Sequence, residues 1–411
     1  MIFHFRCIEC DSEYPEDPKR LVCDSCSGQQ EPGGPTRGVL QVEMEEIPAA
    51  WPPSAPSSAE FLGAFLPIPS PELLPPLVVG GTPLLESPRL RSALGLPRLS
   101  VKDDTRNPSG STKDRASLLV VAKAREYGFD TVATASTGNA AAALAAVGAA
   151  AGIRSVVFVP ESAPEAKLIQ LLCYGAEVLP VEGSYDDAFE LCLAACDAFG
   201  WYNRNTALNP FTIEGKKTAA LEIAAAMAPD VPDAVLVPTG DGAILAGVWK
   251  GFSDLVRAGL IEREPRLIAV QPEGSAAIAR AFSEGAETVT PVPEAASVAD
   301  SLTVQAPRNA ILCLKRIRES GGGAVAVSDE AILEAIPYLA RHTGVFAEPA
   351  GAAALAGLHV ALAEGLVGRE ERVVLLVTGT GLKDVPAASR TVERPTPIRP
   401  ELDAVAERLG A

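Results

Sequence analysis

Aromatic side chains and net positive charge are both scarce in this chain. Only 5% of its 411 residues are Phe, Trp or Tyr, whereas 47% are hydrophobic. That combination argues against an all-β protein and favours an α/β protein rich in Ala, Val and Leu. The formal net charge of −17 argues against nucleic acid or an anionic membrane as a general partner, although a local site can still bind a small anion.

Long hydrophobic runs are also lacking. None reaches the roughly 18 residues that a membrane-spanning helix needs, and the N-terminus MIFHFRCIEC lacks the basic start and long apolar stretch of a signal peptide. We therefore predict a cytoplasmic protein with no membrane partner. In that compartment Cys173, Cys192, Cys196 and Cys313, which lie in apolar helix-like segments, are expected to be reduced core residues.

The N-terminal 30 residues contain two Cys-x-x-Cys pairs separated by twelve residues, Cys7 with Cys10 and Cys23 with Cys26. This spacing is typical of a tetrahedral Cys₄ zinc site, because each pair can form a knuckle. A module of this size needs such a staple to fold. We predict a zinc-ribbon-like module with structural Zn²⁺; iron, or a site that has lost its metal, is the alternative.

The composition changes along the chain. Between Pro48 and Pro76 prolines recur so densely that we expect an extended connector without regular helix, lying over the surface or wrapping the body. A short interaction segment is the alternative for this stretch. After Pro400 a short polar helix is expected to pack on the body. The predicted units are a cysteine module over 1–30, a connector over 31–78, an α/β body over 79–390 with a smaller subdomain inserted at about 115–205, and a tail helix within 391–411.

From about Val79 onward, strand-like and helix-like segments alternate. Several strand-like runs are almost entirely apolar, as expected for strands that are covered on both faces. The predicted strands are 99–104, 131–136, 155–160, 176–181, 234–240, 266–274, 323–329 and 372–381. Such alternation implies a parallel sheet with right-handed crossovers, and ligands then bind outside the carboxyl ends of the strands.

Lys113 follows the first of these strands, in the segment NPSGSTKDR. Pro108 and Gly110 predict a turn, and Ser111 and Thr112 could cap a helix that begins with Lys113. The positive end of the helix dipole favours the neutral amine that a Schiff base requires. From these residues alone, an ordinary exposed lysine is the more frequent outcome.

A second strand end leads through Ser136, Thr137, Gly138 and Asn139 into a helix. Backbone N–H groups at such a helix start bind anions, and the hydroxyl and amide groups add directed hydrogen bonds. A plain turn with a Ser or Thr cap explains the pattern equally well.

Two later strand ends also carry small or hydroxyl-bearing residues. Gly240, Asp241 and Gly242 stand between a strand and a helix, where two glycines let the backbone approach a phosphate closely. Thr378 would present a hydroxyl at the end of the last strong strand, although a tight glycine turn is an equal alternative there. The GxGxxG fingerprint of a dinucleotide site and the Walker motif are both missing.

The order and spacing of these segments resemble threonine synthase. The likeness covers roughly residues 79–387, and it rests on LSVKDDTRNPSGSTKDR, TASTGN, YGAEVLPVEGSYDDA, NPFTIEGKKTAALEI, the GDG loop, GVFAEPAGAAALAGL and TGTGLKD. The resemblance implies the two-domain open parallel-sheet fold of the tryptophan synthase β-like (fold-type II) pyridoxal-phosphate enzymes. It also implies a homodimer that converts O-phospho-L-homoserine and water to L-threonine and phosphate.

The resemblance assigns roles to matching positions. Lys113 would form the Schiff base with pyridoxal 5'-phosphate and later shuttle protons. Asn139 would hydrogen-bond the ring oxygen of the cofactor, and Ser136 to Asn139 would bind the substrate carboxylate. Gly240, Asp241, Gly242, Ala243 and Ile244 would bind the cofactor phosphate. Thr378 would hydrogen-bond the pyridine nitrogen, and a neutral hydroxyl there suits elimination and replacement chemistry.

The stretch TALNPFTIEGKKT departs from the family pattern. Members commonly carry a serine and then an arginine where this chain has Ala207 and Thr212, and a bidentate arginine is a strong phosphate anchor. Lys216, Lys217 or Arg204 are candidates to replace it. The departure leaves open a β-replacement like that of cysteate synthase, or threonine or serine deamination. A non-catalytic body carrying a zinc-ribbon interaction module is a further alternative, which the intact lysine and glycine-loop motifs oppose.

Overall fold

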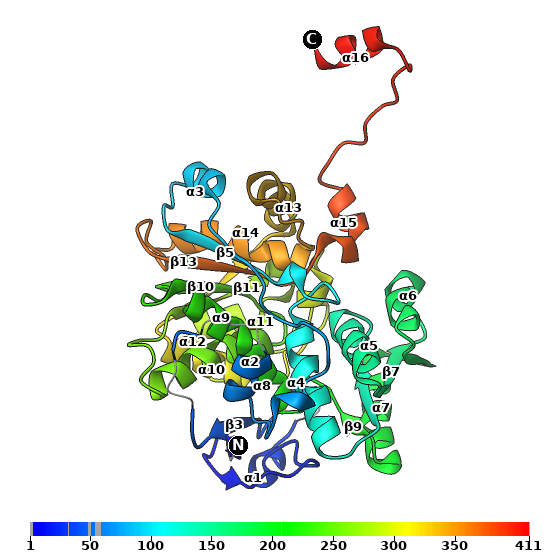
Figure 1. The fold of residues 1–411 in the computed structure, drawn as a ribbon, viewed down its shortest axis with the longest axis vertical. Helices are drawn as coiled ribbons and strands as arrows, with labels where there is room; N and C mark the ends of the chain where they lie inside the picture. The colour runs from blue at the N-terminus through cyan, green and yellow to red at the C-terminus, as the bar shows by residue number, and fades with distance from the viewer. Residues whose placement is uncertain (1–2, 32, 48–50, 54–58, 207, 411) are drawn as a thin grey trace.

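The computed structural model describes residues 3–31, 33–47, 51–53, 59–206 and 208–410. They form a small N-terminal antiparallel sheet and two larger sheets covered by helices (Figure 1). The α/β class with open, mainly parallel sheets that the sequence predicts is confirmed. Each of the eight predicted strand-like runs contains a strand. The boundaries proposed for the domains stay predictions.

The larger sheet has six strands in the order β12-β11-β10-β13-β5-β4. Its strands are β4 (Leu84–Leu85), β5 (Leu99–Asp103), β10 (Ala234–Pro238), β11 (Arg266–Pro272), β12 (Gly323–Val327) and β13 (Val373–Val377). All neighbours are parallel except β4, a two-residue edge strand that runs antiparallel to β5. In β10, Val235 and Val237 pack into one core and Ala234 and Leu236 into another. Both faces are therefore apolar, which explains the continuous hydrophobic runs in the sequence.

The smaller sheet has four parallel strands in the order β8-β7-β6-β9. Its strands are β6 (Thr131–Ala135), β7 (Arg154–Pro160), β8 (Glu177–Val181) and β9 (Tyr202–Asn203). The helices between them are α5 (Asn139–Ala151), α6 (Glu165–Cys173) and α7 (Tyr185–Phe199). In the chain, this segment lies between β5 and β10 of the larger sheet, so the smaller sheet is an insertion between two of its strands.

The other helices of the body cover the larger sheet or join it to the smaller one (Figure 1). The α-helices are α3 (Pro88–Leu94), α4 (Lys113–Glu126), α8 (Phe211–Lys216), α9 (Thr218–Met227), α10 (Ala243–Arg257), α11 (Ala277–Ser283), α12 (Ala310–Glu319), α13 (Asp329–Thr343), α14 (Pro349–Ala363) and α15 (Val385–Ser389). The 3-10 helices are η1 (Pro71–Leu73), η2 (Asp104–Arg106), η3 (Glu273–Ser275), η4 (Asp300–Leu302) and η5 (Gly381–Lys383). Across the described ranges, every helix falls short of the length and hydrophobicity needed to cross a bilayer.

Helices α4 and α8 pack backbone to backbone. A Cβ atom placed on Gly215 would lie 2.3 Å from the carbonyl oxygen of Arg115, a distance that no side chain can tolerate. Glycine at this position therefore lets α8 pack closely against α4, the helix that begins with Lys113. As a result, Lys113 of α4 and Lys216 of α8 line the same cavity.

The N-terminal module contains β1 (Phe3–Cys7), β2 (Glu13–Tyr14), α1 (Asp24–Ser27) and β3 (Leu40–Met44). Strand β1 pairs antiparallel with β2 and with β3, which comes from the segment predicted as connector. The rings of Phe3 and Phe5 stand edge-on to Phe211 of α8, with centroids 5.7 and 5.6 Å away. The module is thus docked on the body by an aromatic cluster.

Three local predictions are wrong. The proline-rich connector contains a helix, α2 (Ala59–Phe65), because Pro56 and Pro67 flank a proline-free stretch whose apolar side chains are buried. The tail helix α16 (Leu402–Leu409) exists but stands away from the body (Figure 1), with Leu402 87% exposed. Cys173 is exposed at the end of α6, unlike the buried Cys192, Cys196 and Cys313. All of these cysteines are free thiols, as expected.

Candidate active site

One cavity collects residues from the carboxyl ends of several strands of the larger sheet. Its lining includes Lys113 after β5, the loop Gly240 to Ile244 after β10, Thr378 after β13 and Glu348 at the start of α14. These groups are far apart in the sequence, and the parallel sheet brings them together because its strands end at one edge. The predicted helix-start residues Ser136, Thr137, Gly138 and Asn139 are not among the residues that line this cavity.

Lys113 is the first residue of α4, and its backbone is fixed next to Thr378 through the hydrogen bond from Thr112 N to Thr378 O, 2.8 Å. Burial lowers the pKa of the Lys113 amine to about 8, although the negative charge of Glu348 acts in the opposite direction and raises it. The predicted cap by Thr112 is wrong, because its hydroxyl has no hydrogen-bond partner. Ser111 Oγ instead accepts from Lys113 N at 3.4 Å. A neutral amine is therefore accessible near physiological pH.

Ser136 to Gly138 join β6 to α5, and Gly138 is the N-cap of that helix. The Ser136 hydroxyl accepts a hydrogen bond from Gly138 N at 3.2 Å. Asn139 is buried, and its Nδ2 donates to Glu348 Oε1 at 2.8 Å. The asparagine thus links the smaller sheet to the cavity in the larger one, while the helix start beside it stays partly accessible to an anion.

The glycine loop is packed closely against the segment that leads into α12. Gly242 has φ +97°, and a Cβ there would lie 2.7 Å from the Cβ of Cys313. The carboxylate of Asp241 accepts hydrogen bonds from Arg308 N (2.6 Å) and Asn309 Nδ2 (2.7 Å), so it braces the loop from outside. The backbone N–H groups at the start of α10 have no partners within the helix and are suited to an anion.

Glu348 is the site residue that the sequence did not predict. It is 5% exposed, and burial raises the pKa of its carboxyl to about 7, whereas the charge of Lys113 lowers it. Its signal in the sequence is a lone acidic residue in the apolar segment GVFAEPAGAAALAGL, directly before the proline that opens α14. Glu348 and Lys113 line the same cavity, and the charge of each affects the pKa of the other.

The positions where the chain departs from the family pattern are only partly described. Ala207 lies outside the described residues. The Thr212 hydroxyl is 2.8 Å from the carbonyl oxygens of both Thr206 and Asn209, so it closes the local turn. Lys217 forms ion pairs with Glu214 and Asp254, outside the cavity lining. Of the candidate replacement cations, Lys216 lines the cavity.

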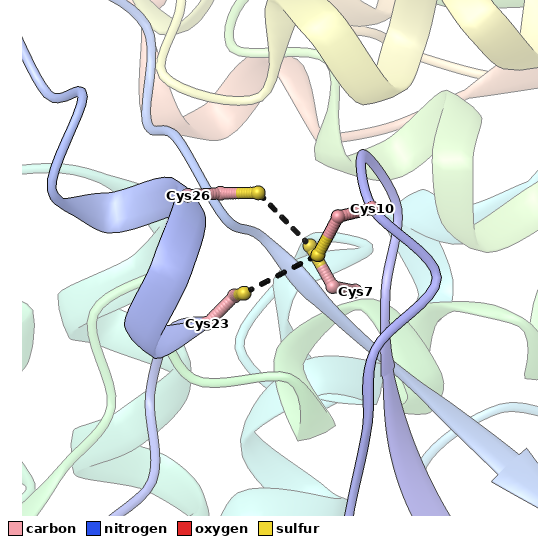
Figure 2. Close-up of side chains that lie close together, drawn as sticks. All are labelled: Cys7, Cys10, Cys23 and Cys26. Carbon is pink, nitrogen blue, oxygen red and sulfur yellow. Dashed lines mark hydrogen bonds between the residues drawn. The ribbon is translucent and has the colours of Figure 1, made fainter.

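The four N-terminal cysteines form a compact cluster (Figure 2). Their sulfur atoms all lie within 4.8 Å of one another, with Cys7 and Cys26 3.8 Å apart and Cys10 and Cys23 3.6 Å apart. Tetrahedral zinc at about 2.3 Å from each thiolate separates the sulfurs by about 3.8 Å. The cluster therefore fits a four-coordinate zinc ion in ligand type, number and spacing.

Comparison with known proteins identifies the family. Residues 76–379 match the model of the family described as pyridoxal-phosphate dependent enzyme. The threonine synthase of Methanosarcina acetivorans is 38% identical over 410 residues, covering 99% of each chain. The chain belongs to the threonine synthase family. The threonine synthase of Methanocaldococcus jannaschii is 36% identical over 406 residues, covering 97% of this chain and 98% of the relative.

A solved structure gives the same fold independently. The crystal structure of a T.th. threonine deaminase superposes with a TM-score of 0.61 at 26% identity, covering 77% of this chain and 94% of that one. The family membership makes this chain a pyridoxal-phosphate-dependent enzyme. The cavity fits that cofactor, since it combines a partly buried lysine of lowered pKa with a loop whose Gly240 leaves no room for a side chain against the cavity residues Ser301 and Leu302.

Proposed function

We propose that this protein is a carbon–oxygen lyase acting on a phosphate ester, which converts O-phospho-L-homoserine and water to L-threonine and phosphate. The observation that carries the proposal is the shared cavity of Lys113, the glycine loop and Thr378, in a chain whose threonine synthase relatives align over almost its whole length. When bound, pyridoxal 5'-phosphate supplies an electron sink conjugated to the α-carbon of the substrate.

The cavity and the helix start beside it would each bind part of the ligands. Lys113 would carry the cofactor, and the backbone N–H groups of Gly240 to Ile244 would bind its phosphate. The neutral hydroxyl of Thr378 would donate a hydrogen bond to the unprotonated pyridine nitrogen. Asn139 would contact the ring oxygen, and the helix start from Ser136 to Asn139 would receive the substrate carboxylate.

Proton transfer would depend on two residues of the cavity. Lys113, with its pKa lowered to about 8, can accept and return a proton at neutral pH once it is released from the cofactor. Glu348 would act as a positioning residue, because its carboxylate accepts from Asn139 at 2.8 Å and its charge acts on Lys113. Glu348 is buried and Lys113 is partly buried, and low exposure to water strengthens their interaction.

The N-terminal cluster would bind Zn²⁺ with Cys7, Cys10, Cys23 and Cys26 as its four ligands. Four thiolates leave no open coordination position, so the ion would be structural. We also propose that the enzyme is a homodimer, as the family resemblance implies.

Deamination of threonine or serine is the second candidate function. The structural likeness to a threonine deaminase and the Thr212 side chain, whose hydroxyl faces backbone carbonyls, both favour it. A β-replacement reaction would use the same cofactor and lysine.

The deciding experiment uses the cofactor-loaded enzyme in two assays. The first supplies O-phospho-L-homoserine and measures phosphate and threonine, and the second supplies threonine and measures keto-acid formation. We expect phosphate and threonine in equal amounts, with no product from Lys113→Ala. Keto acid without phosphate release would replace the proposal with the deaminase.

A further inference from the structure

The fully buried cations of this chain divide into two groups. Seven Lys and Arg residues of the described ranges are exposed by 1% or less, namely Lys102, Lys123, Lys216, Lys217, Lys250, Arg115 and Arg204. Five of them form ion pairs with carboxylates. Arg204 and Lys216 have no carboxylate partner among the residues that the structure describes.

Most of the buried cations are paired with buried carboxylates. Arg115 donates to Asp104 and Glu222, each at 2.7 Å, and Lys102 lies 2.6 Å from the same glutamate. Removing a charge from water costs several kcal/mol unless an opposite charge compensates it. Two neighbouring cations without a paired carboxylate are therefore exceptional among the buried cations of the described residues.

Arg204 is oriented by two hydroxyls but keeps one free donor. Its Nε donates to Ser117 Oγ at 3.2 Å, and its Nη1 donates to Thr206 Oγ1 at 2.8 Å. Its Nη2 is buried without a hydrogen-bond partner. Burial lowers the pKa of the guanidinium to about 10, a sign that its charge is poorly compensated. Thr206, which it contacts, lines the cavity with Lys113.

Lys216 reaches the same cavity from α8. Its Nζ donates only to the backbone carbonyl of Thr212, at 2.9 Å. Burial lowers the pKa of this amine well below its usual value, and the charges of Arg204 and Lys113 lower it further. Because residues four apart lie on one face of a helix, the lysine covers the position of Thr212.

The positive charge in the cavity wall and behind Thr206 therefore exceeds what one phosphate group requires. The phosphate of the cofactor can be bound by the backbone N–H groups of the glycine loop, without a cationic side chain. Lys113 would be joined to the cofactor, which leaves Arg204 and Lys216 for another anion. Guanidinium and ammonium donors together suit a phosphate dianion.

We propose that Arg204 and Lys216 form a second anion subsite, which binds the phosphate group of a phosphorylated hydroxyamino acid. The inference rests on the proposed function for the identity of that substrate. In this subsite, Lys216, one helical turn after Thr212, would take the place of the arginine that family members commonly carry at position 212. Arg204, behind Thr206, would supply the second cation.

The test measures binding of inorganic phosphate to the cofactor-saturated enzyme by calorimetry. Lys216→Met and Arg204→Met should each weaken phosphate binding about tenfold or more, because each removes a charge-assisted hydrogen bond. Affinity for pyridoxal 5'-phosphate, measured by fluorescence titration of the apoenzyme, should change by less than about threefold. Arg154→Met is the matched control, because it removes an exposed cation paired with Glu177 and should leave both affinities unchanged.

Two results would overturn the subsite. One is phosphate affinity in both methionine variants within about twofold of the wild type. The other is a loss of cofactor affinity as large as the loss of phosphate affinity, which would assign the cations to the cofactor. Circular dichroism checks folding, and Lys216→Arg should recover phosphate binding if the charge is what matters. A wild-type enzyme that binds phosphate but releases none from O-phospho-L-homoserine would refute the proposed function and leave this subsite standing.

Discussion

At the scale of single residues, the environment of Lys113 decides its chemistry. Its place at a helix start predicts only a modest preference for the neutral amine, because the helix dipole contributes less than about 1 kcal/mol at an exposed end. Burial in the cavity is the larger effect and lowers its pKa to about 8. The amine is protonated below that pKa and neutral above it, so its reactivity rises with pH through this range.

We expect capture of pyridoxal 5'-phosphate by the apoenzyme to follow this titration. The capture rate should rise with pH and level off above about 8, instead of rising toward the ordinary lysine value of 10.5. Stopped-flow absorbance of the bound cofactor measures it, and Lys113→Ala should show no capture. A rate that still climbs steeply beyond about pH 9.5 would contradict the lowered pKa.

Glu348→Gln should shift the same titration. The carboxylate stabilises the charged form of Lys113, so its loss should move the capture midpoint to lower pH while a side-chain oxygen remains to accept from Asn139. The matched control is Glu364→Gln, at the exposed far end of the same helix. An unchanged midpoint in the Glu348 variant would show that the two groups do not interact.

At the scale of elements, the contact between α4 and α8 depends on one glycine. Gly215→Ala would place a methyl group 2.3 Å from the Arg115 carbonyl and force the helices apart. We expect a loss of about 1–3 kcal/mol in the free energy of unfolding, measured by urea denaturation. Gly28→Ala, whose Cβ would meet its nearest neighbour at 3.6 Å, should stay within about 0.5 kcal/mol of wild type. Equal stability of the two variants would contradict the close approach.

The N-terminal module is coupled to the glycine loop through hydrogen bonds. Thr36 N donates to Arg308 O at 2.8 Å, and Arg308 N in turn donates to the Asp241 carboxylate. A chelator, or Cys26→Ser, should therefore lower both thermal stability and cofactor affinity, because loss of a structural zinc removes folding free energy. Metal analysis, melting temperature and cofactor titration check this. Cys173→Ser, at an exposed free thiol, should change none of them.

At the scale of the whole molecule, the tail helix stands away from the body and leaves most of its large apolar side chains exposed. Leu402 is 87% exposed and Leu409 is 74% exposed, and Figure 1 shows α16 at the end of an extended segment. Deletion of residues 391–411 should leave the melting temperature within about 2 °C of the full chain, because little apolar surface is lost from the core. A larger drop would mean that the tail packs on the body or on a second subunit.

Much of the fold followed from local patterns. The eight apolar runs became strands because continuous hydrophobicity needs cover on both faces, which a parallel sheet provides. The two-residue strands β4 and β9 were not predicted, since elements this short have no periodicity to detect. The helix α2 was missed because the density of prolines outweighed a short proline-free stretch.

The sequence by itself determined the sheet class, the cysteine cluster and the strand ends that carry Lys113, the glycine loop and Thr378, because each is a short-range pattern with a specific backbone or ligand requirement. Only the tertiary structure decided which charges meet. In the folded chain, Glu348 and Lys113 line one cavity, and Lys217 forms an ion pair with Asp254. Arg204 and Lys216 have no carboxylate partner among the described residues. Burial and pairing of charges depend on contacts between distant segments, and no local pattern encodes them.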